Sequence, residues 1–410
     1  MTAGGGSWVP GADGSPFPIE NLPYGVFSRP GMSRRVGVAI GTQVLDLAGL
    51  ASAGLLPSMG GAFARPTLNP FLAEGRPAWR DVRARLTELL GDDRHRGAVT
   101  PALHPLGSAR LHLPFVVADF VDFYSSLDHA TNMGRLLRPG TEPLPANWRH
   151  LPAGYHGRSG SIVVSGTPIT RPCGQRLEGG AVAFGATAKL DFEAEVGFVV
   201  GTGSRPGGRV PARALAEHVF GVVLVNDWSA RDCQAWEYVP LGPFLAKSFA
   251  TSISPWVVPL EALGAARVAP PRQEPPPLPY LVDDDPWALD LSLEVHLNGQ
   301  VLSRPPFAGT YWTPGQQLAH LTANGAGLRT GDLYASGTVS GPGAGQRGSL
   351  IELAENGTAP LPLADGSTRC WLHDGDTVTI SATAPGAHDV TIGLGQVSGT
   401  IHAAPLVGRS

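Results

Sequence analysis

The sequence predicts a mainly β, α+β protein built from two domains. The chain has 410 residues, more than one ordinary hydrophobic core accommodates. Its 54 glycines and 39 prolines favour turns and short strands over long helices. Period-two alternation of apolar residues recurs along the chain, whereas helical periods are few. A hydrophobic content of 42% with 16% charged residues is typical of a folded globular protein.

The first part of the chain reads as a small β-rich domain with one helix. Residues 36–40 and 43–47 alternate around Gly41-Thr42, which predicts a hairpin. A helix is expected between Pro77 and Gly91, because four apolar residues share one stripe: Trp79, Val82, Leu86 and Leu89. The chain becomes proline-punctuated over residues 104–113. We therefore expect an N-terminal domain of residues 1–115 and a C-terminal domain of residues 116–410.

Strands dominate the predicted C-terminal domain. Residues 289–297 alternate strictly, and Asn298-Gly299 is typical of a type I′ hairpin turn. A capping box at Thr313 predicts a helix that ends near Asn324. A short helix over residues 211–220 should lead into an apolar strand, residues 221–225. Six prolines in residues 270–279 predict an extended surface loop, although a domain linker would have the same composition.

Several function classes are disfavoured by composition. The net charge of −4, without a basic stripe, argues against nucleic-acid binding. The three cysteines, Cys173, Cys233 and Cys370, lie far apart and suggest reduced thiols rather than disulfides or a zinc site. The N-terminal segment lacks the basic start and apolar core of a secretory signal. No apolar run approaches the roughly 18 residues of a membrane span. We expect a cytoplasmic protein with no membrane partner.

Four acidic residues stand at or near apolar strands. Glu193 and Glu195 share one face of the strand predicted over residues 190–200, with Cα atoms roughly 6.5–7 Å apart. Asp227 follows the apolar run GVVLVN, and Asp122 follows VVADFV. Four acids without a matching Cys or His cluster favour an oxygen-donor site for Mg²⁺, Ca²⁺ or Mn²⁺ over zinc. Alternating acids also occur on ordinary solvated strand faces, so spacing alone leaves both interpretations open.

Longer motifs connect the chain to a known family. Five segments closely resemble fumarylacetoacetase family members in the same order: residues 18–28 (PIENLPYGVFS), 122–134 (DFYSSLDHATNMG), 151–166 (LPAGYHGRSGSIVVSG), 226–256 (NDWSARDCQAWEYVPLGPFLAKSFATSISPW) and 335–341 (ASGTVSG). The block over residues 226–256 is too long and too particular to arise by chance. The resemblance implies an N-terminal SH3-like β-barrel, a C-terminal mixed β-roll domain and a homodimer.

The resemblance also implies an activity and a set of site residues. The activity is hydrolysis of 4-fumarylacetoacetate to fumarate and acetoacetate, the last step of tyrosine and phenylalanine breakdown, with Mg²⁺ or Ca²⁺ and no organic cofactor. The implied metal residues are Asp122, Glu193, Glu195, Asp227, Lys247 and Thr251. The implied catalytic residues are the base His129, its partner Glu352, and the oxyanion donors Arg231, Gln234 and Lys247. The implied substrate contacts are Tyr124, Arg138, Tyr155, Gln234, Tyr238 and Thr338.

These residue types suit the chemistry of carbon–carbon hydrolysis. A histidine can deprotonate water near neutral pH, and a carboxylate can orient its ring. Glu352 stands between the apolar Ile351 and Leu353, which favours a strand there. A β-diketo acid leaves as an enolate, which a divalent cation would stabilise. The competing hypotheses are an acylpyruvate hydrolase or decarboxylase of the same superfamily and a non-enzymatic Ca²⁺-dependent binding protein.

Overall fold

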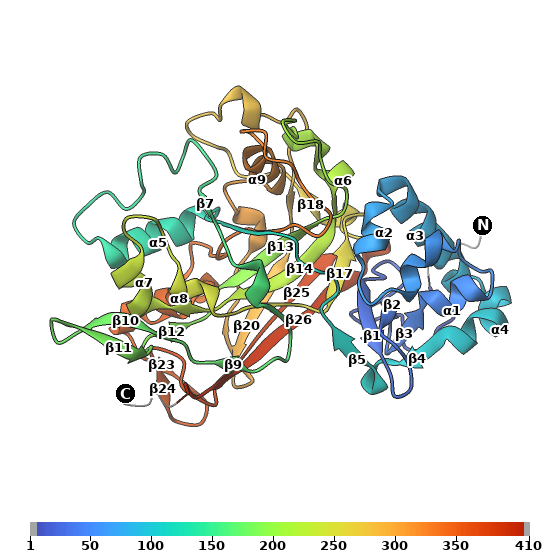
Figure 1. The fold of residues 1–410 in the computed structure, drawn as a ribbon, viewed down its shortest axis with the longest axis horizontal. Helices are drawn as coiled ribbons and strands as arrows, with labels where there is room; N and C mark the ends of the chain where they lie inside the picture. Colours follow the sequence, from blue (N-terminus) through green and yellow to red (C-terminus); the bar gives the residue numbers. More distant parts are fainter. Residues whose placement is uncertain (1–5, 406–410) are drawn as a thin grey trace.

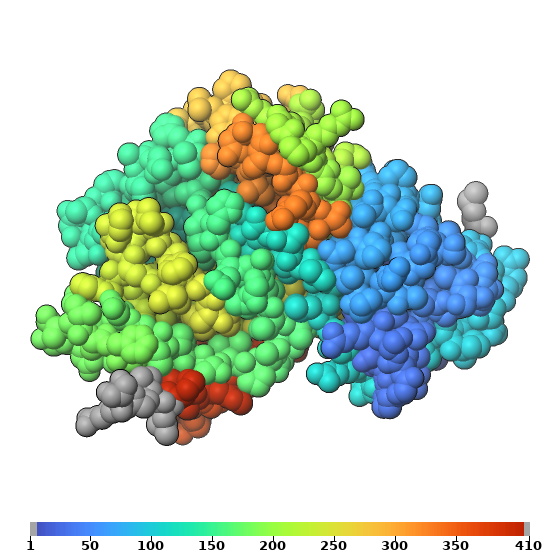
Figure 2. Space-filling view, viewed as in Figure 1, coloured from blue at the N-terminus to red at the C-terminus, as the bar shows by residue number. Residues whose placement is uncertain are grey.

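Strands and short helices make up the computed structural model, which describes residues 6–405. In Figure 1 the blue N-terminal elements lie at one end, and the green-to-red elements form the larger remainder. Figure 2 shows the same division on the surface. Residues 1–5 lie outside this range. They belong to the N-terminal segment in which no secretory signal is expected. Within residues 6–405, no helix is long and apolar enough to cross a bilayer.

A 13-stranded sheet runs from the N-terminal elements into the larger part. Its main path is β4 (Leu103–Pro105), β3 (Gln43–Asp46), β2 (Arg35–Ile40), β1 (Tyr24–Ser28), β17 (Trp256–Pro259), β14 (Val219–Asp227), β13 (Ala194–Val200), β22 (Leu333–Ala335), β6 (Phe120–Phe123) and β7 (Gly154–His156). Strands β5 (Arg110–His112), β8 (Ile162–Val164) and β16 (Thr251–Ile253) pair off this path. The N-terminal strands therefore continue into the main sheet, and no closed barrel is found among the described residues.

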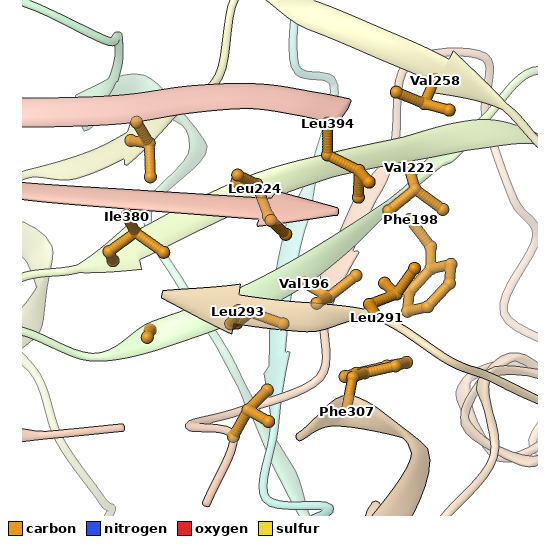
Figure 3. Close-up of a cluster of buried hydrophobic side chains, with 14 of the residues drawn as sticks. Val196, Phe198, Val222, Leu224, Val258, Leu291, Leu293, Phe307, Ile380 and Leu394 are labelled. Carbon is orange, nitrogen blue, oxygen red and sulfur yellow. The ribbon is translucent and has the colours of Figure 1, made fainter. Parts of the chain in front are cut away.

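A second sheet packs against the first. Its order is β21 (Gln300–Ser303), β20 (Ser292–Leu297), β25 (Thr377–Pro385), β26 (Thr391–His402) and β9 (Ile169–Thr170). Figure 3 shows apolar side chains of both sheets pointing toward one another, such as Val222 from β14 and Leu394 from β26. Burial of this apolar surface is the main stabilising contribution to the fold. The structure is thus a strand-rich α+β protein, as the sequence predicts.

The hairpin and the helix predicted in the N-terminal part are confirmed. Strands β2 and β3 form the expected hairpin, with Gly41 at a φ of 54°. Helix α3 (Arg76–Gly91) buries the predicted stripe. Three shorter helices have no clear sequence pattern: α1 (Leu47–Ser52), α2 (Asn69–Ala73) and α4 (Arg96–Val99). The second hairpin strand ends at Asp46, because the Asp46 side chain accepts a hydrogen bond from the Gly49 amide and caps α1.

Most of the local C-terminal predictions hold, but the strand predicted over residues 289–297 is divided into β19 (Ala288–Leu289) and β20. Asn298 and Gly299 both have positive φ, at 51° and 83°, as a type I′ turn requires. Helix α9 (Pro314–Leu321) has the predicted capping box but ends before Asn324. The helix predicted over 211–220 is shorter, comprising a 3₁₀ turn and α6 (Leu215–His218), because β14 already begins at Val219.

The proline-rich segment is a loop and not a domain linker. The strands that flank it, β18 (Arg267–Val268) and β19 (Ala288–Leu289), pair with each other. Both ends therefore belong to one unit. Inside the loop, the Gln273 amide donates to the Tyr311 carbonyl oxygen at 2.8 Å, which fastens it to the protein body.

Candidate active site

Four buried carboxylates meet at one point of the main sheet. Ligand atoms from all four lie within 4.8 Å of one another, and the residues are Asp122, Glu193, Glu195 and Asp227. Asp122 lies in β6, Glu195 in β13 and Asp227 at the end of β14, while Glu193 directly precedes β13. These strands are neighbours or near neighbours in the sheet. The structure thus brings together the four acids that the sequence singled out.

The chemistry of this acidic cluster fits a hard divalent cation. Among the described residues, both carboxylate oxygens of Glu195 and Oδ1 of Asp122 are buried without a hydrogen-bond partner. Burial raises the pKa of both carboxyl groups, and the neighbouring negative charges raise it further. Buried carboxylates without partners are costly, and Mg²⁺ and Ca²⁺ are bound through such oxygens.

Lys247 places a positive charge beside the cluster. It lies on α8 (Leu245–Ser248), and its Nζ bonds to Glu193 and, at 2.8 Å, to Asp227 Oδ2. Burial acts to lower the pKa of Lys247, but Asp227 and Glu193 outweigh it and the pKa is raised. Lys247 therefore stays an ammonium group.

Two hydroxyl groups fix Asp227 from its other sides. Thr251 Oγ1 donates to Oδ1 at 2.8 Å, and the Tyr155 hydroxyl donates to Oδ2 at 2.9 Å. Thr251 stands opposite Asp227 in the β14–β16 pairing. Both contacts orient the carboxylate toward the cluster.

Arg231 and Gln234 lie on the first turn of α7 (Arg231–Glu237). Arg231 Nη2 donates to Glu193 Oε1 at 2.7 Å, and its Nη1 donates to Gln234 Oε1 at 3.0 Å. Because a guanidinium group only donates, the oxygen of the Gln234 amide faces it. The amide nitrogen is then available to another acceptor.

His129 and Glu352 form a buried pair. His129 lies on α5 (Leu127–Leu137), and its Nδ1 is 2.7 Å from Glu352 Oε2. The strand expected around Glu352 is wrong, because this residue lies on the one-turn helix α10 (Leu350–Leu353). An alternation of three residues is too short to distinguish a strand from a helical turn.

Glu352 has three further partners that sequence reasoning missed. Asn132 Nδ2 donates to Oε1 at 2.9 Å, while the Ser340 and Ser349 hydroxyls donate to Oε2 at 2.9 and 2.7 Å. Burial raises the pKa of Glu352, but His129 and these donors outweigh it and lower the pKa to about 2. Asn132 follows His129 by three residues in the motif of residues 122–134. If that motif is helical, this spacing places the two side chains on the same helix face, which could have indicated Asn132. The two serines carry no such signal.

A cavity of about 610 Å³ joins these groups. Its lining includes His129, the predicted oxyanion donors Arg231, Gln234 and Lys247, and three acids of the cluster, together with Tyr124, Arg138, Tyr155, Tyr238 and Thr338. The Tyr124 ring stands edge-on to His129, with centroids 5.3 Å apart. Arg138 is exposed at the rim, and Tyr238 is 47% exposed. Asp227, Thr251 and Glu352 are not part of this lining; Asp227 bonds to Lys247, Thr251 bonds to Asp227, and Glu352 bonds to His129.

Gly337 lets the chain pass close to the cavity wall. Its φ is +77°, and a Cβ atom there would lie 2.0 Å from the Phe123 carbonyl oxygen. Only glycine fits this position without a shift of the backbone. The neighbouring Thr338 is buried, and its hydroxyl has no partner among the described residues. The glycine therefore brings a free hydroxyl group into the cavity.

Comparison with known proteins agrees with this geometry. The "Fumarylacetoacetase N-terminal" family model matches residues 20–114, and the "Fumarylacetoacetate (FAA) hydrolase C-terminal" model matches residues 119–402. Fumarylacetoacetase of Homo sapiens is 47% identical over 96% of this chain and 98% of its own length. Fumarylacetoacetase of Arabidopsis thaliana is 44% identical over 97% of this chain and 99% of its own.

Solved structures agree at the level of the fold. A fumarylacetoacetate hydrolase from Exiguobacterium antarcticum superposes with a TM-score of 0.55 at 18% identity, over 93% of this chain and 99% of that one. A maleylpyruvate hydrolase from Sphingobium gives 0.52 at 15% identity, over 93% and 100%. The fumarylacetoacetases match this chain over nearly its whole length, and the two family models match it one after the other. The chain therefore belongs to the fumarylacetoacetase family.

Proposed function

We propose that this protein hydrolyses 4-fumarylacetoacetate to fumarate and acetoacetate, in tyrosine and phenylalanine catabolism. The observation that carries the proposal is the His129–Glu352 pair and the acidic cluster meeting at one cavity. Relatives of 40–47% identity over nearly the whole chain are named fumarylacetoacetase, and their printed name supports the substrate.

Asp122, Glu193, Glu195 and Asp227 would hold the cation, with Lys247 and Thr251 beside them. Their all-oxygen donor set suits Mg²⁺ or Ca²⁺, and Mn²⁺ also fits. When bound, the cation supplies stabilisation of the enolate that leaves as acetoacetate. The unpartnered oxygens of Glu195 and Asp122 support this assignment.

His129 acts as the general base in this mechanism. Glu352 accepts from Nδ1, so Nε2 is the ring nitrogen that takes a proton from water. The buried Glu352 carboxylate fixes the ring and stabilises the imidazolium that forms. The resulting hydroxide adds to the carbonyl carbon of the fumaroyl group, and cleavage of the adjacent carbon–carbon bond then releases fumarate and an enolate. The enolate takes the proton from the His129 imidazolium and becomes acetoacetate.

Arg231, Gln234 and Lys247 stabilise the oxyanion that develops on the attacked carbonyl. Arg231 and Lys247 are cations held in place by buried carboxylates, so their donors are oriented before the reaction. Around them, Tyr124, Arg138, Tyr155, Gln234, Tyr238 and Thr338 would contact substrate. Arg138 at the rim suits a carboxylate end of this diacid, because guanidinium groups bind carboxylates bidentately.

The decisive experiment is a substrate assay. With Mg²⁺, the purified protein should bleach the ultraviolet band of fumarylacetoacetate, and a chelator should abolish the activity. His129→Gln should lower kcat by about 10³-fold, the range for loss of a general base, while calorimetric Mg²⁺ affinity stays unchanged. Glu195→Gln should instead weaken Mg²⁺ binding.

Hydrolysis of acylpyruvates alone, or release of carbon dioxide, would point to another superfamily reaction. Undiminished turnover by His129→Gln would refute its role as base, and tight Ca²⁺ binding without any turnover would favour the binding protein.

Finer points of organisation are also part of this proposal. We propose that a domain boundary lies near residue 115. The N-terminal strands would have an SH3-like arrangement, and the remainder would form a mixed β-roll. We also propose a cytoplasmic homodimer. Exposed apolar residues on the β10 (Cys173–Glu178) and β11 (Ala181–Ala186) hairpin support a dimer: Leu177, Val182 and Phe184. Sedimentation velocity should give a mass twice that of the chain.

A further inference from the structure

Asp191 is a fully buried carboxylate with no role in the mechanism so far. It ends the short strand β12 (Leu190–Asp191), which pairs with β15 (Ser229–Ala230). Besides the adjacent Phe192 amide, it accepts hydrogen bonds from two segments that are distant in sequence. Arg231 is one of them, and the start of α10 is the other.

On one side, Asp191 fixes the guanidinium plane of Arg231. Arg231 Nε donates to Asp191 Oδ2 at 2.7 Å, and Nη2 donates to Glu193. Two buried carboxylates therefore hold two edges of the group. The third nitrogen, Nη1, is directed toward Gln234, at the cavity where the oxyanion would form.

On the other side, Asp191 holds the helix that carries Glu352. The Leu350 and Ile351 amides donate to its carboxylate at 2.7 and 3.1 Å. These are first-turn amides, which a helix leaves unsatisfied unless a side chain caps them. Ser349, at the N-cap, makes no capping bond and donates to Glu352 instead. Asp191 thus caps α10 from a distant strand and leaves the serine to orient Glu352.

We propose that Asp191 is a positioning residue, which sets Arg231 and the His129–Glu352 pair at a fixed separation around the reacting carbonyl. This inference rests on the proposed function. Asp191 touches no substrate itself and acts through both of its partners. A displacement of either partner would separate the oxyanion donors from the base, and misplaced catalytic groups lower the rate more than substrate binding.

The test compares Asp191→Asn with a matched control, Asp376→Asn. Asp376 is also a buried carboxylate, and it accepts from Arg369 Nε at 2.8 Å and from the His373 amide at 2.7 Å. It does not line the active-site cavity. Both substitutions therefore disturb a buried aspartate that accepts from an arginine and a backbone amide, and only one of them lies at the site.

We expect Asp191→Asn to lower kcat about 100-fold, comparable to loss of one oxyanion donor, with KM and calorimetric Mg²⁺ affinity changed only a few-fold. The control should keep the wild-type kcat, and the melting temperatures of both variants should fall by similar amounts. Equal kcat in the two variants, or loss of Mg²⁺ binding in Asp191→Asn, would overturn the proposal. If Asp191→Asn does not fold, Asp191→Glu should show the same separation of kcat from KM. Failure of both to fold beside a folded control would also overturn it.

A second readout does not depend on activity. The proton shared by His129 and Glu352 should give a downfield imidazole resonance, assigned by its loss in His129→Gln. Asp191→Asn should shift or broaden this resonance, whereas the control should retain it. An unchanged resonance would contradict the link between Asp191 and Glu352. If the wild type fails to cleave fumarylacetoacetate, the proposed function is refuted, and the resonance still decides the role of Asp191.

Discussion

Glu352 accepts hydrogen bonds from four side chains while fully buried, and its charge should therefore affect stability. Its pKa is lowered from 4.5 to about 2. A carboxyl whose folded-state pKa is depressed adds stability above the unfolded pKa, and this is lost as the pH falls through the folded value. We expect Glu352→Gln to cost about 2 kcal/mol at neutral pH, the range for a hydrogen bond to a charged group.

Urea unfolding of metal-free protein at a series of pH values would measure this. The difference between wild type and Glu352→Gln should stay constant down to the unfolded pKa and narrow below it. Glu217→Gln, at a side chain that is 59% exposed, should show little difference at any pH. A difference for Glu352→Gln that widens in acid would contradict the assignment.

Single residues also show where sequence reasoning stops. His129 and the four acids lie within recognisable motifs or directly at strand ends, so their chemistry can be predicted. Asp191 lies in none of these motifs, and the motif over residues 335–341 that contains Ser340 does not reveal its contact with Glu352. Their partners lie in other parts of the chain, 40 and 159 positions away from Asp191 and 12 positions away from Ser340. Such contacts depend on the tertiary fold, which residue spacing does not encode.

Among the elements, α9 offers the clearest test of a locally encoded feature. Thr313 accepts from the Gln316 amide at 3.2 Å, and the Gln316 side chain accepts from the Thr313 amide at 3.1 Å. We expect Thr313→Ala to lower the free energy of unfolding by about 1 kcal/mol, because it removes an N-cap. Thr313→Ser should restore most of this. Denaturant titration would measure both variants, and a Thr313→Ala protein as stable as wild type would show that the cap is dispensable.

Elements with local signals could be predicted, and those without could not. The β20–β21 turn and the start of α9 follow from a few adjacent residues. The one-turn α10 does not, because the group that caps it stands on β12. The ends of α9 and α6 also shift, since β14 and the turn at Thr322 begin earlier than periodicity indicates.

At the scale of the whole molecule, the N-terminal elements and the main sheet share one core. Strands β1 and β17 pair directly, with Gly25 opposite Trp256. The Phe220 ring contacts Tyr24, Phe71 and Trp79, with centroids 5.3, 5.9 and 5.2 Å away. Nothing in the sequence signals this, because the partners lie about 140–230 positions apart.

We therefore expect a single cooperative unfolding transition. Phe220→Ala should lower stability by about 3–5 kcal/mol, as for other buried aromatic truncations, and should shift that whole transition. Differential scanning calorimetry would record it. Two separate heat-absorption peaks, with only one moved by the substitution, would mean that the N-terminal elements unfold independently.

The unpartnered oxygens of Asp122 and Glu195 have a consequence for how the proposed divalent cation would bind. Both carboxyls have raised pKa values without a cation, so uptake of Mg²⁺ should expel protons into solution. Titration heats should then differ between buffers with unlike ionisation enthalpies, and identical heats would exclude the exchange. Mild acidification would strip the ion as a chelator does. Hydrogen ions and magnesium would be direct competitors for the carboxylates of Asp122 and Glu195.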